Sequence, residues 1–99
     1  MSAIKRTIDE NNALIKIAGD FTFAMQQDFR KAYQDLSRSL SYVVDLQNTK
    51  YMDSSALGML LMLRDHAGGD NASISLVNCN PTVSQILKIS NLNRLFSIS

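Results

Sequence analysis

The residues best suited to reversible regulatory chemistry lie together in the segment Tyr51-Met52-Asp53-Ser54-Ser55-Ala56-Leu57-Gly58. The apolar residues that follow predict a helix beginning at about Ser54. The first N–H groups of a helix and the positive end of its dipole stabilise an anion. The fold would therefore tolerate a phosphate on a serine at this position, with a charge of about −1.5 to −2. The same phosphate would place charge at the edge of any apolar surface on the helix.

Spacing alone favours a simpler interpretation of this segment. Asp and Ser are common immediately before a helix, because their side-chain oxygens accept hydrogen bonds from N–H groups of the first turn. Asp53 or Ser54 would then be only the N-cap, a contribution of about 1 kcal/mol. Without further information, the N-cap interpretation is the stronger one.

The predicted helix, which extends from Ser54 to Ala67, is apolar around nearly its whole circumference. Its apolar residues are Leu57, Met59, Leu60, Leu61, Met62 and Leu63. A helix on the surface of a 99-residue domain buries one face. Two interpretations are open: the outer face binds a partner, or another element of the chain covers it. In the first, the contact surface comprises Met52 to Ser55, Leu57, Gly58 and Leu61, with the Asp20-Phe21 turn as a further part.

Other chemically active side chains do not suggest a catalytic or metal site. His66 lies twelve residues after Ser54, about 18 Å along a helix axis, so it cannot act as its base; we expect it at the C-terminal end of the helix dipole. Cys79 is expected to be a small core residue and Asp45 a structural hydrogen-bond acceptor. One Cys and one His are too few for a zinc site of the Cys/His type. We therefore expect no enzymatic activity, no cofactor and no metal.

Composition limits the class of protein further. Ten Lys and Arg against nine Asp and Glu leave a net charge of +1, without the basic excess expected of a nucleic-acid-binding protein. No apolar run reaches the roughly 18 residues of a membrane span, and the N-terminus lacks the apolar core of a signal peptide. These features predict one cytoplasmic domain over residues 1–99 that binds neither nucleic acid nor membrane.

The remaining pattern predicts the elements that position these residues. The order β-β-α-β-α-β-α-β indicates an α/β fold, with a mixed sheet of about five strands packed against three to four helices. The strand at 42–46 is expected to be covered on both faces. Thr22 is a candidate N-cap for the first helix, and Asn80-Pro81 begins the last one. The expected strands are 4–8, 13–18, 42–46, 72–77 and 95–98, with a turn at 9–12 and helices over 25–40, 54–67 and 81–90.

The segment Met52-Asp53-Ser54-Ser55-Ala56-Leu57-Gly58 resembles the signature of STAS domains, specifically bacterial anti-sigma factor antagonists, whose usual form is Met-Asp-Ser-Ser/Thr-Gly-Leu-Gly. The Gly19-Asp20 turn, the strand at 43–46 and the Asn80-Pro81 helix start fit the same family. The run from Leu60 to Gly69 is similar to a proteobacterial subgroup linked to biofilm and motility switching. Ala56 departs from the usual Gly. Phe21-Thr22-Phe23 also lacks an acid that the family often carries there, which puts any phosphate-facing role of that acid in doubt.

The resemblance implies a single STAS domain that acts by partner switching in signal transduction and transcription regulation. In such families the unphosphorylated protein binds an anti-sigma factor or a related regulator. A serine kinase of the histidine-kinase-like ATPase type, often the anti-sigma factor itself, phosphorylates the serine directly after the motif aspartate, and a PP2C-type serine phosphatase reverses this. Here the aspartate is Asp53 and the serine is Ser54, with Ser55 as the runner-up. The alternative is a constitutive STAS subunit that clamps the ATPase of a lipid-transporting ABC complex.

Overall fold

A five-stranded mixed sheet forms the frame of the molecule in the computed structural model, which describes residues 3–99. Its strand order is β1-β2-β4-β6-β7, with β1 antiparallel to β2 and the other neighbours parallel. The α/β class and the mixed sheet are thus confirmed. So is the first hairpin, where the Asp9 N–H donates to the Asn12 carbonyl at 3.0 Å. The strands are β1 (Ile4–Ile8), β2 (Asn12–Ile17), β4 (Ser41–Asp45), β6 (Ile74–Val77) and β7 (Ser97–Ile98).

Two further strands, which the sequence did not predict, form a small separate sheet. They are β3 (Gly19–Phe21) and β5 (Thr49–Met52), and they pair in parallel. With three and four residues, they are too short for an alternating pattern to stand out. The buried Thr49 hydroxyl ties this sheet to the main one by donating to the Ile17 carbonyl at 2.8 Å.

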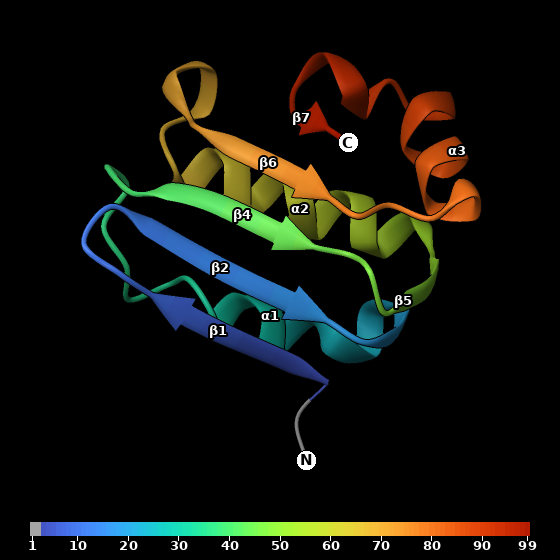
Figure 1. The fold of residues 1–99 in the computed structure, drawn as a ribbon, viewed down its shortest axis with the longest axis horizontal. Coiled ribbons are helices and arrows are strands. Elements are labelled where there is room, and N and C mark those ends of the chain that lie inside the picture. The colour runs from blue at the N-terminus through green and yellow to red at the C-terminus, as the bar shows by residue number, and fades with distance from the viewer. Residues whose placement is uncertain (1–2) are drawn as a thin grey trace.

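Helices cover one face of the main sheet. Figure 1 shows α1 and α2 behind the strands, and α3 beside the ends of β4 and β6. The predicted start of α3 is confirmed, because the Asn80 side chain accepts the Val83 N–H at 2.8 Å, with Pro81 in the first turn. Gly68 follows α2 with a φ of +116°, a left-handed conformation that favours glycine. The helices are α1 (Gln26–Lys31), α2 (Ser54–His66) and α3 (Pro81–Ile89), with 3-10 turns at Phe23–Met25, Gly69–Asn71 and Leu92–Arg94.

The first helix is much shorter than predicted. The expected helix over 25–40 ends as α-helix at Lys31, and Thr22 precedes the 3-10 turn without a side-chain capping bond. Serine side chains compete for the backbone beyond this point: the Ser37 hydroxyl accepts the Ser39 N–H at 3.1 Å. The predicted apolar stripe is nevertheless buried or half-buried: Met25, Phe29, Ala32, Tyr33, Leu36 and Leu40.

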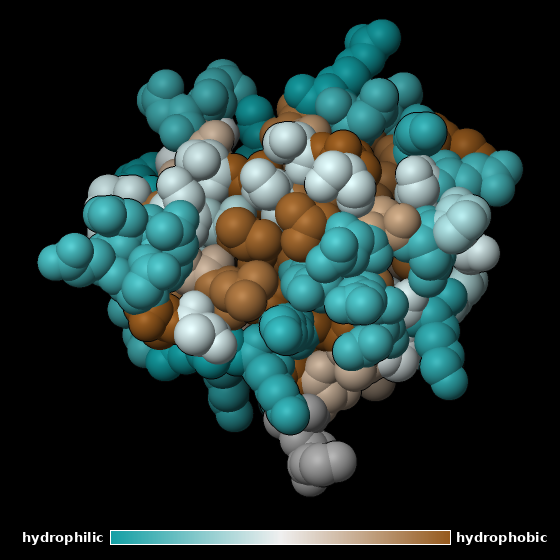
Figure 2. Space-filling view, in the orientation of Figure 1, coloured by the Kyte–Doolittle hydropathy of each residue, from teal (hydrophilic) through white to brown (hydrophobic). Residues whose placement is uncertain are grey.

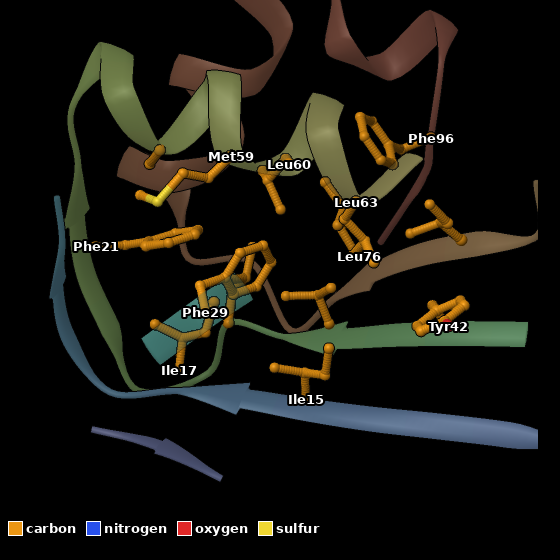
Figure 3. Packing of buried hydrophobic residues seen from close by; sticks show 14 of the residues in the cluster. Ile15, Ile17, Phe21, Phe29, Tyr42, Met59, Leu60, Leu63, Leu76 and Phe96 are labelled. Atoms are coloured by element: carbon orange, nitrogen blue, oxygen red, sulfur yellow. The ribbon is translucent and has the colours of Figure 1, made fainter. Parts of the chain in front are cut away.

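The hydrophobic core lies between the sheet and α1 and α2. Figure 3 shows Leu60 and Leu63 of α2 pointing toward Ile15 and Leu76 of the sheet; all four side chains are fully buried. Phe29 of α1 stacks at a tilt on Phe21, with ring centroids 5.2 Å apart.

In the part of the chain that the structure describes, no helix lies on the opposite face of the sheet, so the expectation that the strand at 42–46 is covered on both sides is wrong. Tyr42 and Val44 are buried under the helices, whereas Val43 is only half-buried on the open face. The register places Leu14 beside Val43, and Figure 2 shows apolar surface near the middle of this face.

Candidate functional site

Asp53 forms the N-cap of α2 and joins it to a second segment of the chain. One carboxylate oxygen, Oδ1, accepts the Ala56 N–H at 2.9 Å, and the other, Oδ2, accepts the Phe23 N–H at 3.4 Å. The Asp53 N–H in turn donates to the Phe21 carbonyl at 3.3 Å. The cap is therefore Asp53 and not Ser54, and the Ser54 side chain is exposed at the first position of the helix.

The small β3–β5 sheet brings the Asp20-Phe21 segment next to the start of α2. Its register pairs Asp20 with Tyr51 and Phe21 with Met52. Asp20 is exposed, but Phe21 and Met52 are almost fully buried. These two expected contact residues therefore cannot touch a partner in this conformation; they support the site from the core.

The exposed residues of α2 form one continuous stripe that begins at Ser54. After Ser54 they follow at helical spacings of 4, 7, 8 and 11 residues: Gly58, Leu61, Met62 and Asp65. The opposite side of the helix is buried through Ala56, Met59, Leu60 and Leu63. Leu57 and Ser55 lie between the two and are half-buried.

No other element of residues 3–99 covers the outer face of α2, so the interpretation that the chain itself buries the whole helix is wrong. Leu61 is 40% exposed and Met62 is 52% exposed. A shallow hollow between α1 and α2 continues the apolar surface beside Met62, and its other apolar lining residues are Phe29, Tyr33 and Met59. The helix stripe that begins at Ser54 therefore carries accessible apolar side chains, and the hollow beside Met62 has a mixed lining that also includes Gln26, Gln27 and Arg30.

Phe23 is part of this region although sequence analysis missed it. Its side chain is 63% exposed, and its backbone is held to the α2 cap by Asp53. Phe21 points inward and Phe23, two residues later, is exposed, so the local sequence indicates the exposure of Phe23 only weakly. Its proximity to Ser54 depends on the β3–β5 pairing, which no local pattern reveals.

Comparisons with known proteins agree on the family. A family model described as "Mlab, STAS domain" matches residues 4–97. A curated relative from Pseudomonas aeruginosa (strain UCBPP-PA14), the STAS-domain containing protein PA14_20770, is 58% identical over 92 residues, which cover 92% of this chain and 91% of the relative. The chain belongs to the STAS domain family.

Solved structures match this STAS domain in fold. The anti-sigma factor antagonist SpoIIAA, a Bacillus protein, in its unphosphorylated form gives a TM-score of 0.79 at 18% identity, covering 98% of this chain and 88% of that one. A STAS domain protein described as an anti-sigma-factor antagonist from Planctomyces limnophilus gives 0.82 at 15% identity, covering 100% and 90%. At these identities the likeness concerns the fold.

The remaining reactive side chains of the STAS domain have structural roles. His66 ends α2, where its Nε2 lies 2.9 Å from the Leu36 carbonyl and its ring packs on Tyr33, so it is held at the far end of the helix from Ser54. Asp45 is the predicted structural acceptor: its Oδ1 accepts the Gln47 N–H at 3.0 Å and an Asn78 Nδ2–H at 3.1 Å.

Cys79 is half-buried rather than fully buried. Burial raises the pKa of its thiol, and the nearby Asp45 carboxylate raises it further. A raised pKa reduces the thiolate fraction and hence the nucleophilicity of the sulfur.

Residues 3–99 contain neither a membrane-spanning helix nor a cluster of metal-ligating side chains. No helix there is long and apolar enough to cross a membrane. No group of three or more His, Cys, Asp or Glu in the same residues is arranged to hold a metal ion.

Proposed function

We propose that this STAS domain is an anti-sigma factor antagonist whose binding is controlled by phosphorylation of Ser54. Without phosphate it binds an anti-sigma factor or a related regulator through the exposed stripe of α2. With phosphate it releases that partner. The observation that carries the proposal is the position of Ser54: its side chain is exposed and begins the stripe that continues through Gly58, Leu61 and Met62.

A phosphate on Ser54 is compatible with the fold and incompatible with an apolar contact. It would lie at the N-terminus of a 13-residue helix, where the first N–H groups and the dipole favour negative charge. Asp53 adds a second negative group next to it. A partner that closes over Leu61 and Met62 would have to strip water from both charges, which is unfavourable unless they are paired.

The geometry supports Ser54 over Ser55 as the modified residue. Ser54 is exposed and lies on the same side of the helix as the exposed residues Gly58, Leu61 and Met62. Ser55 is half-buried, and the residue four positions later, Met59, is buried against the core. A phosphate on Ser55 would therefore lie closer to the core side of α2 than to the exposed stripe.

A phosphorylation switch at Ser54 requires three kinds of partner activity: a regulator that is bound, a kinase and a phosphatase. They are an anti-sigma factor or serine kinase of the histidine-kinase-like ATPase type and a PP2C-type serine phosphatase, acting in the cytoplasm where ATP is available. The resemblance of the run from Leu60 to Gly69 to a proteobacterial subgroup supports a role of this switch in biofilm formation and motility. The alternative function, a constitutive subunit that clamps the ATPase of a lipid-transporting ABC complex, would use the same apolar surface without phosphorylation. The exposure of Ser54 on that surface favours the first function.

Phosphopeptide mapping tests the proposed function directly. We expect protein purified from its own cells to carry one phosphate on Ser54, and deletion of the cognate kinase gene to remove it. Ser54→Ala should abolish the phosphopeptide, whereas Ser55→Ala, the matched control, should retain it. Co-purification with an ABC ATPase, with no phosphopeptide recovered in either background, would favour the alternative.

Gly58 gives a second prediction, because nothing inside the chain requires glycine there. A Cβ added at Gly58 would meet no atom of residues 3–99 within 4 Å beyond its chain neighbours and the backbone of its own helix. Glycine in a helix interior is less stable than alanine by roughly 0.5–1 kcal/mol. We expect Gly58→Ala to raise the free energy of unfolding by about this amount, measured by urea denaturation, and to weaken binding of the regulator, because glycine allows the partner's backbone to approach α2 closely. If Gly58→Ala bound the regulator as tightly as the wild type, Gly58 would lie outside the contact.

A further inference from the structure

Strand β1 is an outermost strand of the main sheet, and from Lys5 to Ile8 no other strand of residues 3–99 pairs with its outer edge (Figure 1). Its residues from Lys5 to Ile8 are all exposed. An exposed edge strand presents backbone N–H and C=O groups that can pair with a further strand.

The hydrogen bonds at the two ends of the hairpin define which backbone groups point outward. The Ala18 N–H donates to the Ala3 carbonyl at 2.8 Å, and the Asp9 N–H donates to the Asn12 carbonyl at 3.0 Å. Both bonds join residues that are directly opposite in the β1–β2 register. In an antiparallel ladder such pairs alternate with non-bonded ones. The N–H and C=O groups of Arg6 and Ile8 therefore point away from β2, toward the open edge.

The charged side chains of β1 and of the turn after it lie on different faces of the sheet. Lys5 and Thr7 of β1 project from the open face of the sheet, and Asp9 follows two residues further on. One Asp9 carboxylate oxygen, Oδ1, accepts the Asn11 and Asn12 N–H groups of the turn at 3.0 and 2.9 Å, so a charge pair with Lys5 would use the other oxygen, Oδ2. Inside the chain Lys5 is paired in register with Lys16, a like charge, which is unfavourable for directly opposite residues. On its other side Lys5 faces the open edge. Arg6 projects from the helix face instead, where its guanidinium already pairs with Asp35 at 2.7 Å.

We propose that two copies of this chain pair through their β1 strands, antiparallel and around a two-fold axis at Thr7. Arg6 of one copy then exchanges backbone hydrogen bonds with Ile8 of the other, so the outward groups are satisfied on both sides. Lys5 faces Asp9 of the second copy, and by symmetry Asp9 faces Lys5. The two threonines at position 7 face each other across the axis. Opposite charges and paired threonines are favourable cross-strand neighbours.

Other registers of the same strand fit less well. An axis at Arg6 places two arginines opposite each other. An axis at Ile8 shortens the paired segment and leaves Lys5 without an acid beside it. The axis at Thr7 is the register in which each Lys5 gains a carboxylate on the side away from Lys16.

The β1 pairing leaves the α2 surface available. β1 forms an edge of the sheet, whereas α2 covers one face (Figure 1). The exposed stripe of α2 lies on the side of the helix opposite its buried residues. A dimer of this kind would carry two Ser54 sites. Since one strand edge buries little area, the association is expected to be weak and dependent on concentration.

Sedimentation equilibrium of the full chain over a range of protein concentrations tests the proposal. We expect a reversible monomer–dimer equilibrium that shifts toward monomer as salt screens the charged pairs. Lys5→Glu should weaken dimerisation by about 10- to 100-fold, because two attractive pairs become repulsive. The matched control is Lys88→Glu, the same charge change on an exposed residue of α3, which should leave the dimer unchanged.

Lys5→Glu separates loss of dimer from loss of fold. The substitution replaces the Lys5–Lys16 repulsion with an attraction, so its melting temperature should not fall. Mixing it with Asp9→Lys should restore a heterodimer, since every Lys5–Asp9 position in the mixture again pairs opposite charges. Asp9→Lys also loses the bonds that Asp9 Oδ1 accepts from the Asn11 and Asn12 N–H groups, so we expect it to melt at a lower temperature, and the mixture is measured well below that temperature. A wild-type chain that stays monomeric at the highest concentration reached, or a dimer that Lys5→Glu weakens no more than Lys88→Glu, would overturn the proposal. So would edge pairing with a strand of a different protein while the chain alone remains monomeric.

Discussion

Phosphorylation of Ser54 is expected to weaken binding of the cognate anti-sigma factor or kinase by about 100- to 10,000-fold, which corresponds to about 3–5.5 kcal/mol. The physical reason is desolvation: Leu61 and Met62, on the same helix stripe, are 40% and 52% exposed and would carry the apolar contact. A doubly charged group at the start of that stripe has to lose its water when the partner closes. Isothermal titration calorimetry with unphosphorylated and phosphorylated chains measures the difference.

Substitutions at Ser54 separate charge from the loss of the hydroxyl. Ser54→Ala should bind about as tightly as the unphosphorylated wild type and should not respond to the kinase. Ser54→Asp carries one charge rather than nearly two, so its affinity should fall by a smaller factor, about 10- to 100-fold. Ser55→Ala is the control that remains switchable. Equal affinity of wild type, Ser54→Asp and phosphoprotein for the same regulator would contradict the phosphorylation switch.

Substitution of Ser54 should leave the stability of the fold unchanged. Asp53, not Ser54, caps α2 by accepting the Ala56 N–H at 2.9 Å. Loss of the Ser54 hydroxyl therefore removes no capping bond. Thermal unfolding of Ser54→Ala and Ser54→Asp is accordingly expected to stay close to that of the wild type, so a change in binding can be assigned to the surface.

Elements marked by strong local signals could be predicted from the sequence. Asn80-Pro81 begins α3 and Gly68 ends α2, because capping and glycine conformations are properties of a few neighbouring residues. The first helix extends less far than its apolar stripe, because periodic burial continues in the turns after Lys31. Burial was thus predicted correctly where helical conformation was not.

The candidate site could be predicted only as far as it lies on one helix. The exposure of Ser54, Gly58 and Leu61 follows from their spacing on α2. Phe21 and Met52 were expected at the surface but are buried, because each is the inward residue of a short strand that the sequence did not reveal. The position of Phe23 beside the cap depends on that same pairing, a contact between residues 30 apart in sequence.

Two adjacent leucines of α2 are expected to respond to substitution in opposite ways. Leu60 is fully buried among the core side chains shown in Figure 3, whereas Leu61 points outward and is 40% exposed. Leu60→Ala should lower the free energy of unfolding by about 2–5 kcal/mol, since it leaves a cavity in a packed core. Leu61→Ala should change it by no more than about 0.5 kcal/mol. Urea denaturation of both variants gives these values.

The affinity for the regulator should respond in the reverse order: Leu61→Ala should lower it more than Leu60→Ala. This difference distinguishes a contact residue from a structural one. Leu61→Ala is expected to weaken the unphosphorylated complex about tenfold or more, because it removes apolar area from the centre of the proposed contact. Leu60→Ala should retain affinity under conditions where it remains folded. Ile89→Ala, which removes an exposed apolar side chain from α3, is the control that should change neither quantity. If Leu61→Ala and Ile89→Ala bound the regulator equally well, the exposed face of α2 would not be the contact surface, whatever the phosphorylation state of Ser54.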